Sequence, residues 1–272
     1  MNQRRYGSIA ILLVLTHGLA CSMLQARRGL TWRITLQIES PAPDRAAAIR
    51  RTILVIEKRL DAVGIAGFEV HQDSSASDRV IVSLPNAPDH ERLKRLIVAG
   101  GKLELFHIVS LPSPEPCRTF DTKEEATAFA KSIVSPASRR VLPYSERSSG
   151  KTQQGAKWVI VDWPPVIDGT ELRDAKAVRS RAGNEDEYEI FFSLKQEGAY
   201  KFGSWTGANI NEYIGVALND EVKSVAFIRG QIFDQAEITG RFTKQAAEDL
   251  ALVLSSGALP APIRVIEEQA IQ

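Results

Sequence analysis

The stretch "LVLSSGALPAP" at Leu252–Pro262 constrains the fold more than any other part of this sequence. An apolar helical pattern ends there at Gly257, a residue suited to the left-handed conformation that follows many helices. Pro260 and Pro262 come next, and each fixes φ and lacks a backbone donor, so the helix cannot continue through them. We therefore predict a rigid change of direction, with Gly257, Pro260 and Pro262 as candidate hinge residues.

A strand-like stretch, "PIRVIEE" at Pro262–Glu268, follows the proline turn. A single strand is not stable alone and must pair with a sheet. We predict that residues 261–272 return to a sheet formed near the start of the chain. The residues in between would then be an insertion, and the proline turn would be a hinge between two bodies.

The order of elements near the N-terminus predicts the sheet to which this strand returns. Alternating apolar residues predict a strand at Thr31–Glu39, and apolar residues spaced by three and four predict a helix at Asp44–Gly64. The patterns further predict strands at 68–72, 79–85 and 102–109 and a helix at 89–99. This order is that of a ferredoxin-like module, an antiparallel sheet with both helices on one face.

The second half of the chain predicts another α+β module. Prolines and a Ser-rich stretch interrupt the pattern between residues 111 and 157, where one helix is predicted at 121–135. Patterns after that predict strands at 158–163 and 187–194, helices at 168–178, 195–210 and 243–256, and a hairpin through Asn219-Asp220. The expected fold is α+β: a ferredoxin-like base at 30–110, an irregular insertion or linker at 111–157, and an inserted head at 158–260.

The N-terminus has the outline of a secretory signal. Two arginines precede the apolar run Ile9–Leu15, and small residues lead to Cys21. We predict a signal peptide at 1–20 and a linker at 21–29, with Cys21 in the position of the lipidated cysteine of a bacterial lipoprotein. Ordinary cleavage after Ala20 and an uncleaved short anchor are the alternatives. The expected location is periplasmic or otherwise extracytoplasmic, with membrane attachment through the lipid.

The composition argues against several classes of function. A net charge of +1 is too small for the phosphate neutralisation that nucleic-acid binding needs. The four histidines lack metal-site spacing, and no paired cysteines, phosphate loop or Gly-x-Ser-x-Gly motif occurs. We expect no enzyme activity, cofactor or metal. An undetected hydrolase would require Asp168 and Asp174 to converge with a histidine.

Four blocks of the second half carry a family resemblance. In order they are "VIDGTELRDAKAV", "FFSLKQEGAYKFGSWTGANI", "YIGVALNDEVKSVAFIRGQI" and "AEITGRFTKQAAEDLALVLSSGALPAPIRVIEEQ". They resemble the large periplasmic domain of SecD, the partner of the Sec translocon, and the similarity extends from about Ala46 to the end of the sequence. The resemblance implies a base with an inserted head. The sequence ends at Gln272, before the region that forms proton-coupling membrane helices in full-length relatives, so we expect no proton coupling from this chain.

The resemblance implies an accessory role in Sec-dependent protein export, with transient binding of unfolded secretory polypeptide or of Sec translocon components. A sheet edge beside an apolar groove suits such a client, because backbone pairing tolerates variable sequence. Tyr200, Phe202 and Trp205 are candidates for lining this groove; alternatively, they form the core of the second module. The alternative function is that of a structural or scaffold lipoprotein that binds one specific cell-envelope partner.

Overall fold

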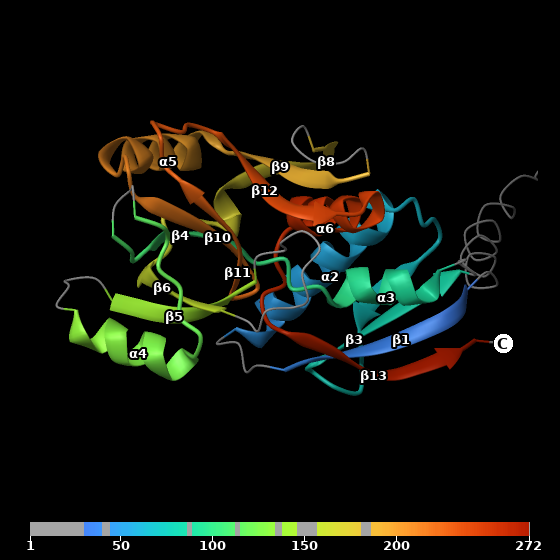
Figure 1. The fold of residues 1–272 in the computed structure, drawn as a ribbon. Coiled ribbons are helices and arrows are strands. Elements are labelled where there is room, and N and C mark those ends of the chain that lie inside the picture. Colours follow the sequence, from blue (N-terminus) through green and yellow to red (C-terminus); the bar gives the residue numbers. More distant parts are fainter. Residues whose placement is uncertain are drawn as a thin grey trace, which may run out of the picture.

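The computed structural model describes residues 30–39, 44–85, 89–111, 115–133, 138–145, 157–180 and 186–271. The predicted signal at 1–20, the linker at 21–29 and Cys21 lie outside the described residues. Two bodies lie next to each other, one with a four-stranded sheet and a larger one with a six-stranded and a three-stranded sheet (Figure 1). Among the residues described, no helix combines the length and the apolar character needed to cross a bilayer.

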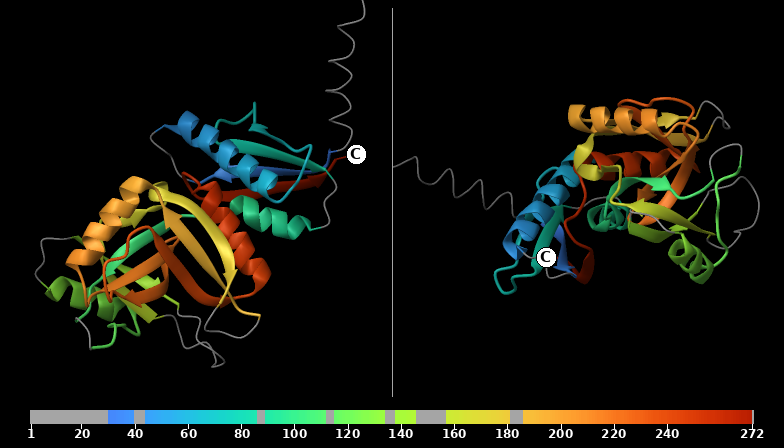
Figure 2. Two further views of the ribbon diagram at one scale, coloured as in Figure 1. Left: turned by 90° about the horizontal axis from the view of Figure 1, so that it is seen from above. Right: turned by 90° about the vertical axis from the view of Figure 1, so that its left-hand side faces the viewer.

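The smaller body, which we call the base, combines the start of the chain with its end. Its elements are β1 (Leu30–Ile38), α2 (Arg45–Ala62), β2 (Glu69–Gln72), β3 (Arg79–Pro85), α3 (His90–Val98) and β13 (Ile263–Ala270). The sheet is antiparallel throughout, in the order β13-β1-β3-β2. Both helices pack on the same face of this sheet, where their apolar side chains share one core with β1 and β3 (Figure 2).

The last strand occupies the edge of the base sheet beside the first strand. Register runs from Ile38 opposite Ile263 to Trp32 opposite Ala270, with one irregularity next to Thr35. Ile263 is buried in the base core. Near the far end of the pairing, Trp32 Nε1 donates a hydrogen bond of 3.1 Å to Glu268 Oε1. Residues more than 200 positions apart therefore complete a single sheet.

The larger body, which we call the head, contains every described element between α3 and β13. These elements are β4 (Leu103–Ile108), α4 (Lys123–Ser132), β5 (Ser138–Tyr144), β6 (Lys157–Trp163), β7 (Ile167–Asp168), a 3-10 turn (Gly169–Glu171), β8 (Leu172–Arg179), β9 (Tyr188–Leu194), α5 (Gln196–Ala208), β10 (Tyr213–Leu218), β11 (Glu221–Phe227), β12 (Gln235–Phe242) and α6 (Lys244–Ser256). One sheet has the order β10-β11-β5-β6-β4-β7 and the other β12-β9-β8. An additional pairing of β10 with β4 closes five strands into a ring.

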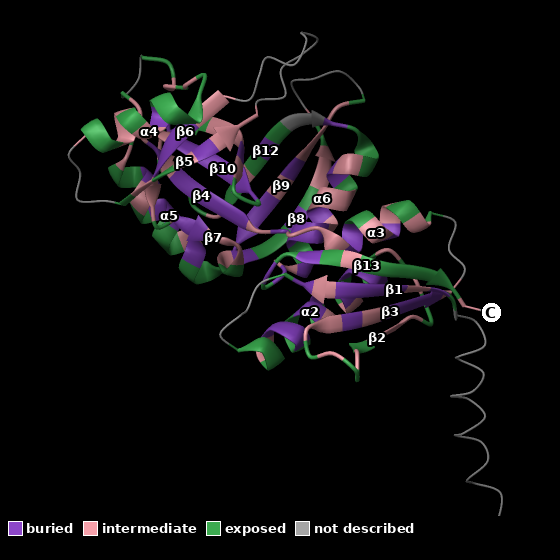
Figure 3. Ribbon diagram, turned by 90° about the horizontal axis from the view of Figure 1, so that it is seen from below, coloured by how far each residue is buried: buried purple, intermediate pink, exposed green. Residues whose placement is uncertain are grey.

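Two hydrophobic cores support the head. One fills the ring of five strands, with buried side chains from every strand in it: Phe106, Ile108, Leu142, Val159, Val161, Ala217 and Val222. The other lies between the ring, the three-stranded sheet, α5 and α6. Burial is therefore continuous along the central strands of the head and falls off on α4 and the outer faces of the helices (Figure 3).

The assignment of the strand at 102–109 to the base is wrong. The observed strand β4 pairs with β10, β6 and β7 in the head. The reason is visible in its burial: Leu103 and Leu105 face one head core, while Phe106 and Ile108 face the ring core. A strand that is apolar on both faces needs a core on both sides, which the one-sided base sheet does not offer.

Two further expectations for the head differ from the structure. The stretch at 111–157, expected to be irregular, contains strand β5, which pairs with β6 along its whole length, including Pro143 opposite Trp158. The predicted helix at 168–178 is a 3-10 turn followed by strand β8. Asp168 and Glu171 form a capping box at the 3-10 turn, but β8 pairs with β9 from Leu172 onward, so no α-helix follows.

Candidate functional site

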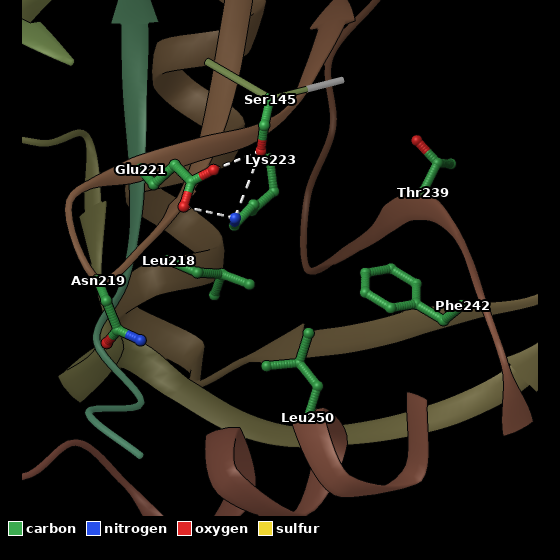
Figure 4. Close-up of a pocket in the computed structure, with 8 residues that line it drawn as sticks. All are labelled: Ser145, Leu218, Asn219, Glu221, Lys223, Thr239, Phe242 and Leu250. Carbon is green, nitrogen blue, oxygen red and sulfur yellow. Dashed lines mark hydrogen bonds and ion pairs between the residues drawn. The ribbon is translucent and has the colours of Figure 1, made fainter. Parts of the chain in front are cut away.

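A crevice of about 270 Å³ opens in the head between the β10–β11 hairpin, β12 and α6 (Figure 4). Its apolar side is formed by Leu218, Phe242 and Leu250, which come from three different elements. Its polar side is formed by the side chains of Ser145, Asn219, Glu221, Lys223 and Thr239. The crevice is therefore amphipathic, with an apolar floor next to a polar rim.

The polar rim is held by interactions among its own members. Lys223 Nζ lies 2.6 Å from Glu221 Oε2 and donates a 3.4 Å hydrogen bond to Ser145 Oγ. Ser145 Oγ in turn donates a hydrogen bond to Glu221 Oε1. Figure 4 shows these three side chains together on one side of the crevice, with Thr239 across from them. Because the cation and the carboxylate neutralise each other, this rim has no strong charge preference.

Strand edges border the crevice. β12 is an outer strand of the three-stranded sheet, and β11 is paired with β5 at one position, Val222 opposite Tyr144. β11 and β12 lie next to each other but belong to different sheets, and they are linked by a contact of 3.3 Å between Ser224 Oγ and Thr239 Oγ1. Edge strands carry backbone groups that can pair with an added strand. Backbone pairing capacity thus lies beside an apolar floor.

A buried arginine joins the base to the end of the head. Arg59 of α2 is fully buried and donates five hydrogen bonds, to the carbonyl oxygens of Leu96, Ile97, Ala99 and Gly257 and to Ser256 Oγ, at 2.6–3.1 Å. These acceptors belong to the C-terminal ends of α3 and α6, where helix carbonyls lack partners and favour a cation. Burial lowers the pKa of Arg59 to about 10, so the guanidinium remains charged at neutral pH.

Two further contacts fix the joint between base and head. Arg92 of α3 donates hydrogen bonds of 3.0 and 2.7 Å to Asp249 Oδ1 of α6, which raises the pKa of Arg92. The backbone N–H of Leu259 donates a 2.8 Å hydrogen bond to the carbonyl of Gly100. The segment after α6 is therefore held on the base side as well as on the head side.

The three predicted hinge residues lie in this joint. Gly257 ends α6 with φ of 94°, in the region that favours glycine. Pro260 and Pro262 are exposed. Leu259, which precedes Pro260, and Ala261, which lies between the two prolines, are buried in the base core. The prolines thus hold alternate residues of the turn pointed into the base.

The aromatic residues predicted to line a groove do not form one surface. Phe202 is 1% exposed and lies in the head core, while Tyr200, two positions away on α5, is 79% exposed. Trp205 is half-buried against the same core, with its ring 5.6 Å from that of His107. None of the three lines the crevice. Phe202 fits the alternative interpretation of the sequence, in which these residues belong to the core. Tyr200 lies two positions away on the same helix, so its side chain points to a different face.

The titratable groups considered for catalysis lie apart from one another. Asp168 accepts hydrogen bonds from Thr170, chiefly through its hydroxyl, and these lower the pKa of Asp168. Asp174 is exposed on β8. His107 contacts Asp162 instead, with its Nδ1 atom 2.7 Å from Asp162 Oδ2. Across the parts of the chain that the structure describes, no group of three metal-binding side chains converges.

The geometry defines a class of protein: a two-body α+β module whose bodies meet at the turn after α6 and whose larger body carries an amphipathic crevice. Two family models match the chain, "Protein translocase subunit SecDF, P1 domain, N-terminal" over residues 49–110 and "SecDF, P1 head subdomain" over residues 141–261. The chain belongs to the SecD/SecDF family, and the matching parts are those of the P1 domain.

Individual relatives agree with the family models. The "Protein translocase subunit SecD" of Aquifex aeolicus (strain VF5) is 32% identical over 223 residues, and that of Koribacter versatilis (strain Ellin345) is 30% identical over 224 residues. Both alignments cover 82% of this chain, and the chain spans 39% of the length of each relative.

Solved structures show the same likeness. A structure described as "Structure and function of a membrane component SecDF that enhances protein export" is similar over 88% of this chain and all of the other, with a TM-score of 0.63 and 26% identity. "Crystal structure of SecDF in Super-membrane-facing form" has a TM-score of 0.65 and 25% identity, and the match covers 88% of this chain and 30% of the other.

Proposed function

We propose that this chain is an extracytoplasmic accessory of Sec-dependent protein export that binds translocating or unfolded polypeptide transiently in the crevice of the head. The observation that carries the proposal is the position of the edge strand β12, next to β11, which pairs with β5 at one position, beside the apolar floor of Leu218, Phe242 and Leu250. An extended client would add backbone hydrogen bonds at the edge and place every second side chain on the floor. The charge-neutral rim suits clients of varied sequence.

The same proposal includes the organisation of the chain. The order β13-β1-β3-β2 with two helices on one face supports a ferredoxin-like base in which β13 takes the fourth position, and the head is inserted between α3 and β13. Lipid attachment at Cys21 would hold this module at a membrane.

Crosslinking from the crevice tests the proposed function. A photo-crosslinking residue at Thr239, which is exposed on the rim, should capture many unrelated secretory chains in cells while their export is stalled. The matched control is Leu54 on the base, which is 57% exposed and remote from the crevice along the fold. One constant partner at Thr239 would support the scaffold function instead, and equal capture of secretory chains at both positions would remove the crevice from the proposal.

The hinge belongs to the proposal too, because a receptor of changing clients benefits from movement of the head relative to the base. Changing Pro260 and Pro262 together to alanine should loosen the head relative to the base without melting either. Both side chains are exposed, so the substitution removes stiffness and no packing. Small-angle scattering should show a larger radius of gyration, at a melting temperature close to that of the parent chain. An unchanged scattering profile would contradict the hinge.

A further inference from the structure

A second groove, of about 500 Å³, lies on the outside of the head between α4 and β5. Its floor is partly apolar, with Ile133 and Leu142 among the lining residues. Its charged lining consists of cations alone: Lys123, Lys131, Arg139 and Arg140. Figure 1 places α4 and β5 together at the end of the head that is remote from the base sheet. This groove shares no residue with the crevice.

Aromatic rings hold two of the four cations. The guanidinium of Arg140 lies 3.3 Å from the centroid of the Trp163 ring, and Lys123 Nζ lies 5.6 Å from that of Trp158. A cation over an aromatic face keeps its charge and most of its donors available, so such contacts orient the groups without neutralising them.

Carboxylates neutralise little of the groove. Arg139 lies 3.3 Å from Asp162, and Lys157 of the neighbouring strand pairs with Asp121 outside the groove. Within the described ranges, Lys123, Lys131 and Arg140 have no carboxylate at ion-pair distance. The chain as a whole has a net charge of +1, so the positive potential here is local. Around this concave surface, Lys123, Lys131 and Arg140 are therefore exposed and form no ion pair with any residue that the structure describes.

We propose that the α4–β5 groove binds an acidic, extended segment of a partner protein. Charge complementarity selects the sign of the ligand. Shape selects a chain over a membrane surface, because a concave groove with an apolar floor admits a polypeptide but not the plane of lipid headgroups. The apolar floor also distinguishes a peptide, which has side chains to place there, from a free inorganic anion. This site is separate from the crevice and does not depend on the function proposed there.

Binding of a short, fluorescein-labelled Glu-rich peptide to the full chain tests the proposal. Anisotropy should detect binding that weakens with added salt, as expected for ion pairs near the surface. The same peptide with Gln in place of Glu should bind at least about tenfold more weakly. The double change Lys131→Glu with Arg140→Glu should reduce affinity by a similar factor, because it replaces attraction by repulsion.

Matched variants separate the groove from charge in general. Arg50→Glu with Lys58→Glu changes the net charge of the chain equally on exposed positions of α2 and should leave peptide affinity unchanged. Lys123→Gln with Lys131→Gln alters two exposed side chains of α4, leaves the stacked Arg140 intact, and should still weaken binding several-fold. Equal binding of the Glu and Gln peptides overturns the proposal. So does equal loss in the α2 variant, full competition by inorganic phosphate at the peptide concentration, or groove-dependent binding of anionic vesicles in place of the peptide.

Discussion

Replacing Arg59 by methionine should destabilise the chain by about 3 kcal/mol or more, because carbonyl groups at two helix ends lose their donor inside the protein. Methionine fills a similar length, so the effect measures lost hydrogen bonds more than an empty space. The acceptors on α3 belong to the base, whereas Ser256 and Gly257 belong to the joint. We therefore expect two results: a lower free energy of unfolding in urea, and faster hydrogen exchange at the amides around Leu259.

Two other substitutions show whether the guanidinium itself matters. Arg51→Met changes an exposed arginine on the same helix and should shift the unfolding free energy by no more than about 0.5 kcal/mol. Arg59→Lys keeps a charge but supplies a point donor in place of a planar fork, so its stability should lie between those of the parent and Arg59→Met. If the Arg59→Met variant unfolds at the same urea concentration as the parent chain, Arg59 does not stabilise the joint between base and head.

A chain that stops at Pro262 should lose the cooperative folding of the base while the head remains folded. Without β13, β1 becomes an edge strand, the buried Ile263 is removed from the base core, and Trp32 loses its hydrogen bond to Glu268. The loss of one buried aliphatic side chain alone costs about 2 kcal/mol, and the backbone pairing adds to it. Hydrogen exchange should show lost protection along β1 and β3 and retained protection along β4 and β10.

The control for this truncation is a chain that stops at Ala270. It keeps all of β13 and loses the final backbone hydrogen bond, from the N–H of Ile271 to the carbonyl of Thr31. Its base should melt as in the parent chain. Retained protection from hydrogen exchange along β1 in the chain that ends at Pro262 would mean that β13 contributes little to the base sheet. The proposal that the turn after α6 serves to return β13 to this sheet would then be contradicted.

The elements that sequence reasoning located best are those with local signals. Helix α6 begins after Thr243 and ends at Gly257, and the hairpin turn at Asn219-Asp220 has positive φ at both residues, because capping and turn chemistry depend on neighbours in the chain. Pairing partners are a different matter. Strand β4 follows α3 directly and looked like the last strand of the base, but its two buried faces place it in the head. Alternating apolar residues predict that a segment is a strand, but the sheet to which the strand belongs depends on residues far away in the sequence.

The site was less accessible from sequence. The crevice takes its lining from positions as distant as Ser145 and Leu250, which no periodic pattern connects. Arg59, by contrast, can be recognised in the sequence pattern. It lies three residues after Ile56 and four before Val63, within the apolar stripe of α2. A cation in such a stripe implies buried acceptors nearby. The acceptors themselves, at the ends of α3 and α6, emerge from tertiary packing.

The distance along the chain between Trp32 and Glu268, 236 residues, sets the order in which the molecule can mature. Synthesis delivers β1 of the base before the head and β13 of the base only after the whole of the head. Assembly of the base therefore has to wait for synthesis of the head, and its rate is limited by the search of β13 for a partner strand that was made much earlier. During that interval the unpaired edge of β1 can pair with other strands, so the base is most vulnerable to aggregation before β13 has been made.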